Sequence, residues 1–269
     1  MYSAQLSVAR QAAAAASELI RKAYRGNFKV SIKADATPVT EVDVAAEKAI
    51  HAVLHNAFPG YGFYGEETGA QDMDAEFLWL VDPIDGTKSF VRGYPMFSVQ
   101  IGLMHRGELV VGVSAAPCWN GEGEIAWAER GKGAFLDGQP IRVSDAARIE
   151  QIALSTGNLA RLAASPAWAR FGAIVPRLQR IRGYGDFLHY HLLASGKIDA
   201  VVESDVNILD IAALSVIVQE AGGRMTELCG RPLRLETRTV LAATPELHAQ
   251  LLKDIDFSDS DGRSENVRP

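Results

Sequence analysis

The chain has 269 residues and a formal net charge of −6 at pH 7, with 48% hydrophobic and 22% charged residues. This balance is typical of a folded globular protein and excludes wholesale disorder. The negative charge argues against a nucleic-acid partner, so a protein of this kind that handles an anionic substrate needs a local cation such as a metal.

The expected location is the cytoplasm, with no membrane partner. The two cysteines, Cys118 and Cys229, stand in no metal-binding spacing and are typical of thiols in a reducing compartment. The N-terminal residues show no signal-peptide pattern, and the Ala-rich stretch 11–16 is too short to span a bilayer.

In the first half of the chain, two helices precede a run of β-rich segments. Helical spacing of apolar residues predicts helices at 4–24 and 43–57, with a polar loop at 33–40 between them. An apolar run at 77–81 predicts a buried strand. Turn signals within 97–116 and 125–143 separate further β-rich segments, which predict an antiparallel sheet.

The second half alternates strands and helices. Strands are predicted at 152–155, 180–182 and 198–203, and helices at 166–174, 187–194 and 211–221. This alternation indicates α/β layering, so the fold class is α/β (α+β). We divide the chain into an N-terminal α+β half (1–145), a C-terminal α/β half (146–253) and a polar tail (254–269) that we expect to be disordered.

Acidic residues collect where loops meet regular elements, namely at Asp43, Glu47, Glu66, Glu67, Asp82, Asp85 and Asp210. If these carboxylates converge, their mutual repulsion is costly without a cation between them. Oxygen ligands without His or Cys select Mg²⁺, Mn²⁺ or Ca²⁺. Taken singly, Asp43 and Asp210 also fit helix N-caps, and Asp82 fits a turn before Pro83.

Segment 79–90 combines several functions in a short stretch. An apolar strand leads into Asp82 and Asp85, which bracket a predicted turn. Gly86 permits close backbone approach to an anion, and the amides of Gly86 and Thr87 can hold phosphate oxygens. The Thr87 hydroxyl beside two metal-binding carboxylates can orient an attacking water.

Residues 82–87, Asp-Pro-Ile-Asp-Gly-Thr, resemble the signature of the inositol monophosphatase family. Segments 40–47, 58–67, 209–213 and 220–223 resemble further family blocks in the right order, and the similarity extends from about residue 6 to 250. The resemblance implies a layered α-β-α-β-α sandwich of the inositol monophosphatase and fructose-1,6-bisphosphatase type. It also implies a homodimer and inhibition by Li⁺.

The same resemblance implies roles for individual residues. Two or three Mg²⁺ ions, or Mn²⁺, would be held by the carbonyl of Ile84 and by the carboxylates of Glu66, Asp82, Asp85 and Asp210. The catalytic residues would be Asp43, Thr87 and Glu66, with Asp43 and Thr87 activating the water. Substrate would be bound by Gly86, Thr87, Asp186, Glu203 and Asp210. The implied activity is hydrolysis of a small phosphorylated metabolite by metal-activated water.

The favoured substrate is histidinol phosphate. Asp186, in an Arg-x-x-Gly-Asp pattern, resembles the histidinol-phosphatase branch, and its carboxylate can pair with an amine or imidazole. It also fits a cap for the helix predicted from Phe187. Glu203, seven residues before Asp210, resembles a hydroxyl-binding Glu of inositol phosphatases, which keeps inositol-1-monophosphatase as the alternative. Leu209 departs from the aromatic residue usual before the last metal-binding Asp.

Three other functions are less favoured. Fructose-1,6-bisphosphatase and 3′(2′),5′-bisphosphate nucleotidase would need cationic residues around a second phosphate, where the sequence offers Arg92 and Arg182. A non-catalytic regulatory module would have lost metal carboxylates or Thr87, and none is substituted. His189 and His191 are predicted to be packing or surface residues rather than catalytic ones.

Overall fold

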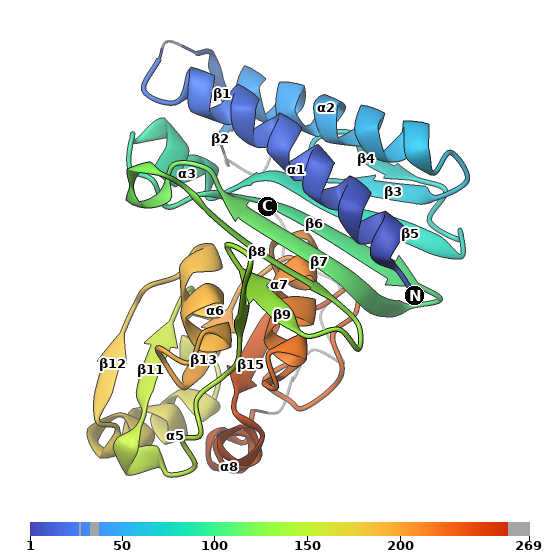
Figure 1. Cartoon of the computed structure of the whole chain (residues 1–269). Helices are drawn as coiled ribbons and strands as arrows, with labels where there is room; N and C mark the ends of the chain where they lie inside the picture. The colour runs from blue at the N-terminus through green and yellow to red at the C-terminus, as the bar shows by residue number, and fades with distance from the viewer. Residues whose placement is uncertain (27, 33–37, 258–269) are drawn as a thin grey trace.

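Helices and sheets alternate in five layers in the computed structural model, which describes residues 1–26, 28–32 and 38–257 (Figure 1). The outermost layer holds α1 (Ser3–Ala23) and α2 (Glu41–Ala57), which pack on an eight-stranded sheet. Helices α6 (Asp186–Ala194) and α7 (Ile208–Glu220) lie between this sheet and a five-stranded sheet. Helices α5 (Ala167–Ile174) and α8 (Pro245–Ile255) cover the far side. The predicted α-β-α-β-α sandwich is confirmed.

The eight-stranded sheet has the order β10-β9-β8-β7-β6-β5-β3-β4. Its strands are β3 (Gly62–Gly65), β4 (Gly69–Gln71), β5 (Phe77–Asp85), β6 (Ser98–His105), β7 (Glu108–Ala116), β8 (Glu124–Glu129), β9 (Ala134–Leu136) and β10 (Gln139–Ile141). All neighbours are antiparallel except β3 and β5, which are parallel. The predicted antiparallel sheet is therefore confirmed, with β3 as the exception.

The five-stranded sheet has the order β12-β11-β13-β15-β14. Its strands are β11 (Ala153–Thr156), β12 (Arg180–Arg182), β13 (Ala200–Ser204), β14 (Arg224–Thr226) and β15 (Thr239–Ala243). The first three are parallel, and β15 is antiparallel to both β13 and β14. Short helices α3 (Thr87–Val91) and α4 (Ala160–Ala163) and the strand pair β1 (Val30–Ile32) and β2 (Pro38–Thr40) complete the fold, together with 3₁₀ turns at Trp119–Gly121, Ile149–Gln151 and Val175–Arg177.

The boundaries of two predicted segments differ from those in the structure. Part of the predicted loop 33–40 is strand β2, and residues 33–37 lie outside the described residues. The predicted tail begins too early, because α8 continues to Ile255 and Phe257 is buried among the side chains of α5 and α8. Residues 258–269 lie outside the described residues.

Two glycines allow α7 to lie directly on the eight-stranded sheet. A Cβ added to Gly112 of β7 would lie 2.2 Å from the carbonyl oxygen of Ala213. One added to Gly102 of β6 would lie 2.9 Å from the Cβ of Ala212. Helix α7 is almost entirely buried, as its continuous apolar sequence requires. A helix from the second half of the chain is thus held against the sheet of the first half.

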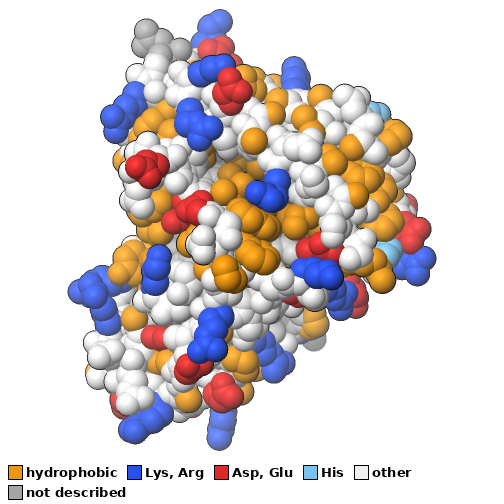
Figure 2. All heavy atoms as spheres, viewed as in Figure 1, with side chains coloured by type: hydrophobic (Ala, Val, Ile, Leu, Met, Phe, Trp, Pro, Cys, Tyr) orange, Lys and Arg blue, Asp and Glu red, His pale blue; other side chains and the backbone are white. Residues whose placement is uncertain are grey.

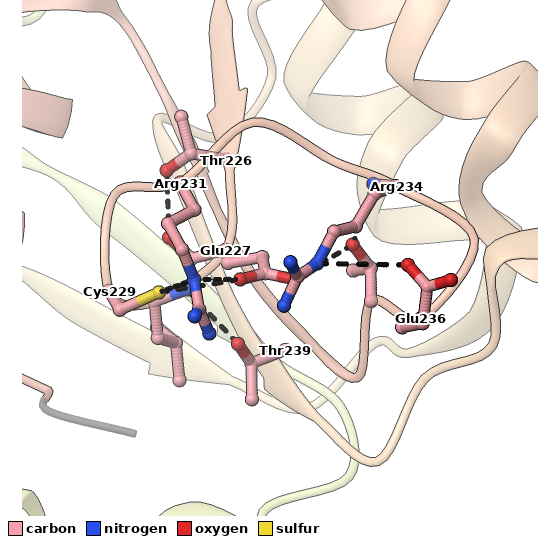
Figure 3. Close-up of polar contacts among 9 residues, drawn as sticks. Thr226, Glu227, Cys229, Arg231, Arg234, Glu236 and Thr239 are labelled. Atoms are coloured by element: carbon pink, nitrogen blue, oxygen red, sulfur yellow. Dashed lines mark hydrogen bonds and ion pairs between the residues drawn. The ribbon is translucent and has the colours of Figure 1, made fainter. Parts of the chain in front are cut away.

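The loop between β14 and β15 is organised around the buried carboxylate of Glu227 (Figure 3). Its oxygens accept hydrogen bonds from Arg231 Nε at 2.8 Å and Thr237 Oγ1 at 3.0 Å, and Arg234 Nε lies 3.7 Å away. A buried carboxylate needs such partners because its desolvation is otherwise uncompensated. Glu227 and its arginines therefore fix this loop at the end of the five-stranded sheet.

Across the described ranges, no helix is both long enough and apolar enough to cross a membrane.

Candidate active site

Three carboxylates from distant parts of the sequence meet at one end of the eight-stranded sheet. Asp82, Asp85 and Asp210 each place an oxygen within 4.8 Å of the others. Asp82 and Asp85 come from β5, and Asp210 comes from the first turn of α7. The close approach of α7 to the sheet is what brings Asp210 to β5.

Strand β5 itself shapes half of the cluster. The sequence predicted a turn between Asp82 and Asp85, but β5 continues through Asp85 with its register shifted against β6. This irregularity is a β-bulge, which re-aims side chains without ending the strand. The backbone amide of Ile84 donates to Asp82 Oδ1 at 2.9 Å. The predicted turn is therefore wrong, but the two aspartates still face one site.

Asp210 completes the capping box of α7 and belongs to the cluster at the same time. The amide of Asn207 donates to Asp210 Oδ2 at 2.8 Å, and Leu209 donates its amide to the Asn207 side chain, which forms a capping box. A carboxylate has two oxygens, so this cap leaves room for a second function. The predicted N-cap role of Asp210 is wrong, because the N-cap is Asn207, but the capping-box role of Asp210 is compatible with binding a metal.

Asp43 plays an equivalent double role at α2. The helix begins at Glu41, two residues before the predicted start. The predicted N-cap role of Asp43 is wrong, because Thr40 is the N-cap and Asp43 closes the capping box. Thr87 Oγ1 lies 3.1 Å from Asp43 Oδ1 and 3.0 Å from the carbonyl oxygen of Ile84. Asp43 is fully buried, and burial raises its pKa. The structure thus joins Asp43, Thr87 and Ile84 as one group.

Glu66 follows β3, the parallel neighbour of β5, and its backbone amide donates to the carbonyl of Val81 at 3.2 Å. Its carboxylate hydrogen-bonds with Asp82. The following loop is held by Glu47, whose carboxylate accepts from the amides of Glu67 at 2.9 Å and Thr68 at 2.7 Å. Glu66 therefore joins the aspartates, while Glu47 supports the loop.

The electrostatics of this cluster fit a bound cation. Burial, followed by repulsion from Glu66 and the other two aspartates, raises the pKa of Asp82 well above its ordinary value. Burial and neighbouring carboxylates likewise raise the pKa of Asp85, and they raise that of Asp210 to about 7. Protonation or a cation must relieve such repulsion. The donors are all oxygen, so the residues present fit a hard divalent metal.

Gly86 sets the backbone between β5 and α3. Its φ is +92°, and an added Cβ would lie 2.5 Å from the carbonyl oxygen of Met96. A residue with a side chain is excluded by both the conformation and the space. Gly86 is the N-cap of α3, whose first residue is Thr87. This places both predicted phosphate-binding residues directly after Asp85.

A cavity of about 70 Å³ adjoins the carboxylates, lined by residues that include Asp85, Asp210, Asn158, Asp186, Tyr190 and Glu203. The two predicted substrate carboxylates, Asp186 and Glu203, therefore share this cavity with two of the predicted metal ligands. Among the described residues that line it, neither Arg92 nor Arg182 appears.

Asp186 does not cap α6, because the N-cap is Gly185. Its backbone takes a left-handed φ of 45°, which is uncommon for a residue with a side chain. Burial, followed by the charge of Glu203, raises the pKa of Asp186 to about 6. The cap interpretation of Asp186 is wrong, and its carboxylate is instead one wall of the cavity.

Glu203 is held from three sides. Tyr190 donates its hydroxyl at 2.9 Å, Asn158 donates its backbone amide at 3.2 Å, and His189 Nε2 lies 3.2 Å away. Burial opposes ionisation, but the His189 charge and these hydrogen bonds lower the pKa of Glu203. Sequence analysis missed Tyr190 and Asn158. His189 is buried as a packing residue would be, yet it contacts the cavity carboxylate.

The model of the inositol monophosphatase family matches residues 1–260. Histidinol-phosphatase of Mycobacterium tuberculosis is 41% identical over 221 residues, which cover 80% of this chain and 84% of that protein. Inositol-1-monophosphatase of Caulobacter vibrioides is 34% identical over 254 residues, covering 88% and 97% of the two chains. The crystal structure of extragenic suppressor protein suhB from Bartonella henselae aligns with a TM-score of 0.85 at 31% identity, covering 94% of this chain and 98% of that one.

Proposed function

Because this chain belongs to the inositol monophosphatase family and is a metal-dependent phosphomonoesterase, we propose that its substrate is histidinol phosphate. The observation that carries this proposal is the pair of carboxylates, Asp186 and Glu203, in the cavity beside Asp85 and Asp210. A phosphate ester bound at the metal cluster would extend its alcohol portion toward this pair. Two carboxylates are suited to bind a cationic group.

We propose that the metal is Mg²⁺, held by the carboxylates of Glu66, Asp82, Asp85 and Asp210 and by the carbonyl of Ile84. When bound, the metal lowers the pKa of a coordinated water and stabilises charge on the phosphoryl oxygens. By family resemblance, Li⁺ would inhibit. The number of ions, two or three, belongs to the proposal.

The water-activating group in this proposal is Thr87 with Asp43. With its one hydrogen directed to Asp43 Oδ1, 3.1 Å away, the Thr87 hydroxyl can accept a hydrogen bond from the water, and the proton that the water loses would pass through this hydroxyl to Asp43. Asp43 is buried and its raised pKa brings it closer to that of an effective proton acceptor. Gly86 and Thr87 would orient the phosphate through their backbone amides. Thr87 and Asp43 therefore orient the water and take up its proton.

The charge of the cavity favours a cationic substrate over a neutral one. Asp186 has a pKa of about 6 because it is buried beside Glu203. The amine or imidazole of histidinol phosphate would relieve that repulsion, whereas an inositol ring offers hydroxyl groups alone. Inositol phosphate remains the alternative, since Glu203 can also accept a hydrogen bond from a hydroxyl. Bisphosphates are disfavoured because Arg92 and Arg182 are not among the described cavity residues.

The proposal is tested by phosphate release from histidinol phosphate and myo-inositol 1-phosphate with the wild-type chain and Asp186→Asn. Asn keeps the size and removes the charge. Loss of a hydrogen bond to a charged group costs about 1.5–3 kcal/mol, so we expect kcat/KM for histidinol phosphate to fall roughly 10- to 100-fold. Turnover of inositol phosphate should change little.

Asp145→Asn is the matched control, because the Asp145 side chain is 85% exposed and bonds only to exposed Arg142 among the described residues. It should leave both substrates unaffected. Faster wild-type turnover of inositol phosphate, or equal losses for the two substrates in Asp186→Asn, would rule out a cationic specificity site.

We also propose a homodimer. Figure 2 supports a contact surface, because hydrophobic side chains gather across the middle of the face on which β8 and β9 run. Light scattering coupled to size exclusion would give a mass near twice 29.0 kDa. A mass of one chain at micromolar concentration would contradict this.

A further inference from the structure

A chain of hydrogen bonds leads from Asp85 into the interior. Ser98 Oγ donates to Asp85 Oδ2 at 3.4 Å, and Gln100 Nε2 donates to Ser98 Oγ at 2.7 Å and to Ser114 Oγ at 3.1 Å. Ser114 Oγ lies 2.8 Å from His191 Nε2, and His191 Nδ1 lies 2.6 Å from Glu124 Oε1. We call Ser98, Gln100, Ser114, His191 and Glu124 the Gln100 chain.

The Gln100 chain lies where apolar side chains would be expected. Ser98, Gln100 and Ser114 are fully buried on the sheet face that packs against α6 and α7, and His191 of α6 is 1% exposed. The same face carries Leu78, Leu80 and Met104 further along the strands. Burying polar groups is costly unless each is hydrogen-bonded. The polar residues are therefore confined to the strand ends beside the metal carboxylates.

Gln100, in the middle of the Gln100 chain, lies beside a second carboxylate, that of Asp82. Gln100 pairs directly with Asp82 across β5 and β6, just as Ser98 pairs with Asp85. Side chains at paired positions share a face of the sheet, with Cβ atoms about 5 Å apart. Gln100 Oε1 is buried and accepts no hydrogen bond from the described part of the chain. With a metal bound, this acceptor would be available to a hydrogen bond from a metal-bound water.

The donor directions are fixed along the part nearest the site. The amide nitrogen of Gln100 donates to Ser98, so the Ser98 hydroxyl directs its own hydrogen to Asp85. The second hydrogen of the same amide goes to Ser114, which His191 and Glu124 anchor from the far side. Hydrogen bonds in such a series strengthen one another. A rotation of the Gln100 amide would break both of its serine contacts.

We propose that Ser98, Gln100 and Ser114 are positioning residues for metal binding, anchored by the His191–Glu124 pair. They hold Asp85 in one orientation and keep an acceptor next to Asp82, so the metal binds a preformed set of oxygens. The residues that orient a metal ligand typically change metal affinity about 10- to 100-fold when they are removed. The proposal rests on metal binding at the aspartate cluster and is independent of which phosphate ester is the substrate.

Calorimetric titration of the full chain with Mn²⁺, without substrate, tests separately whether the cluster binds a metal and whether the Gln100 chain strengthens that binding. No binding by the wild-type chain would remove the metal site itself. If the wild type binds, we expect the Kd of Ser98→Ala to rise about tenfold and that of Ser114→Ala a few-fold. In the double variant the losses should be less than additive, because both changes interrupt one chain.

Ser215→Ala is the matched control. Ser215 is also fully buried, and its hydroxyl donates to the carbonyl of Ala212 within α7 at 3.0 Å, apart from the Gln100 chain. Its Kd should equal that of the wild type even if its Tm falls. Unchanged Kd in Ser98→Ala and Ser114→Ala, or an equal rise in Ser215→Ala, would overturn the proposal. If Ser98→Ala does not fold, Ser114→Ala, which is separated from Asp85 by two residues, decides alone.

Discussion

Replacing Gly112 with Ala tests whether the close approach of α7 builds the active site. The added methyl carbon would lie 2.2 Å from the carbonyl oxygen of Ala213. Ordinary contacts between carbon and a carbonyl oxygen are about 3.3 Å or longer, so helix and strand must separate by about 1 Å. The obstacle is backbone, which cannot rotate away. Asp210 lies three residues before Ala213 on the same helix and would move with it.

The size of the effect follows from this displacement. Overpacking of a filled core costs about 1–3 kcal/mol, which corresponds to a Tm lower by roughly 2 to 12 °C for a chain of this size. The carboxylate oxygens of the cluster lie within 4.8 Å of one another, so a shift of this size alters the metal geometry. A misplacement of about 1 Å can reduce the rate about 100-fold. We therefore expect weaker metal binding together with a lower kcat.

Thermal unfolding with and without Mg²⁺, calorimetric metal titration and phosphate release measure these effects. Gly172→Ala in α5 is the control, because an added Cβ there meets nothing within 4 Å. The free energy of unfolding of that variant should rise by up to about 1 kcal/mol, because Ala has a higher helix propensity than Gly. In Gly102→Ala the added Cβ would lie 2.9 Å from a side-chain carbon. The Tm and metal affinity of this variant should lie between those of Gly112→Ala and Gly172→Ala. Wild-type Tm and metal affinity in Gly112→Ala would refute this account of the site.

Three further predictions concern the carboxylate cluster. Asp85→Asn should lower kcat by orders of magnitude. Its metal-free Tm should stay level or rise, because one repelling charge is lost. Near-normal turnover would remove Asp85 from the metal ligands. In EDTA, stability should fall as pH rises from about 4 to 7, because the folded state holds a proton on Asp210 up to its pKa of about 7 whereas the unfolded chain releases it near 3.8. Saturating Mg²⁺ should flatten that dependence in Tm measurements, and a metal-free Tm that rises over this range would contradict the assigned repulsion. Phosphate release should cease in EDTA, return with Mg²⁺ and be inhibited by excess Ca²⁺, whose looser coordination misplaces the water; equal turnover in EDTA would exclude metal catalysis.

Local signals in the sequence were enough to place most of the cluster on its elements. The apolar run of β5 ends at Asp82 and Asp85, and capping boxes start α2 near Asp43 and α7 near Asp210. Strand periodicity and capping depend on residues a few positions apart, so one sequence reveals them. The same signals predicted a turn between Asp82 and Asp85 and missed the β-bulge, because a bulge is defined by the register of the neighbouring strand.

Tertiary structure alone decided which of these elements meet. Gly102 and Gly112 bring α7 onto the sheet, and this contact joins Asp210 to Asp85 across 125 positions of sequence. The residues around His191 in the sequence predict only that it lies in a helix. Its hydrogen-bond partners Glu124 and Ser114 lie 67 and 77 positions away in the sequence. Sheet register and helix packing set such contacts, and neither depends on neighbours in the sequence. The sequence therefore identified the candidate groups, while packing between the two halves determined that they share one site.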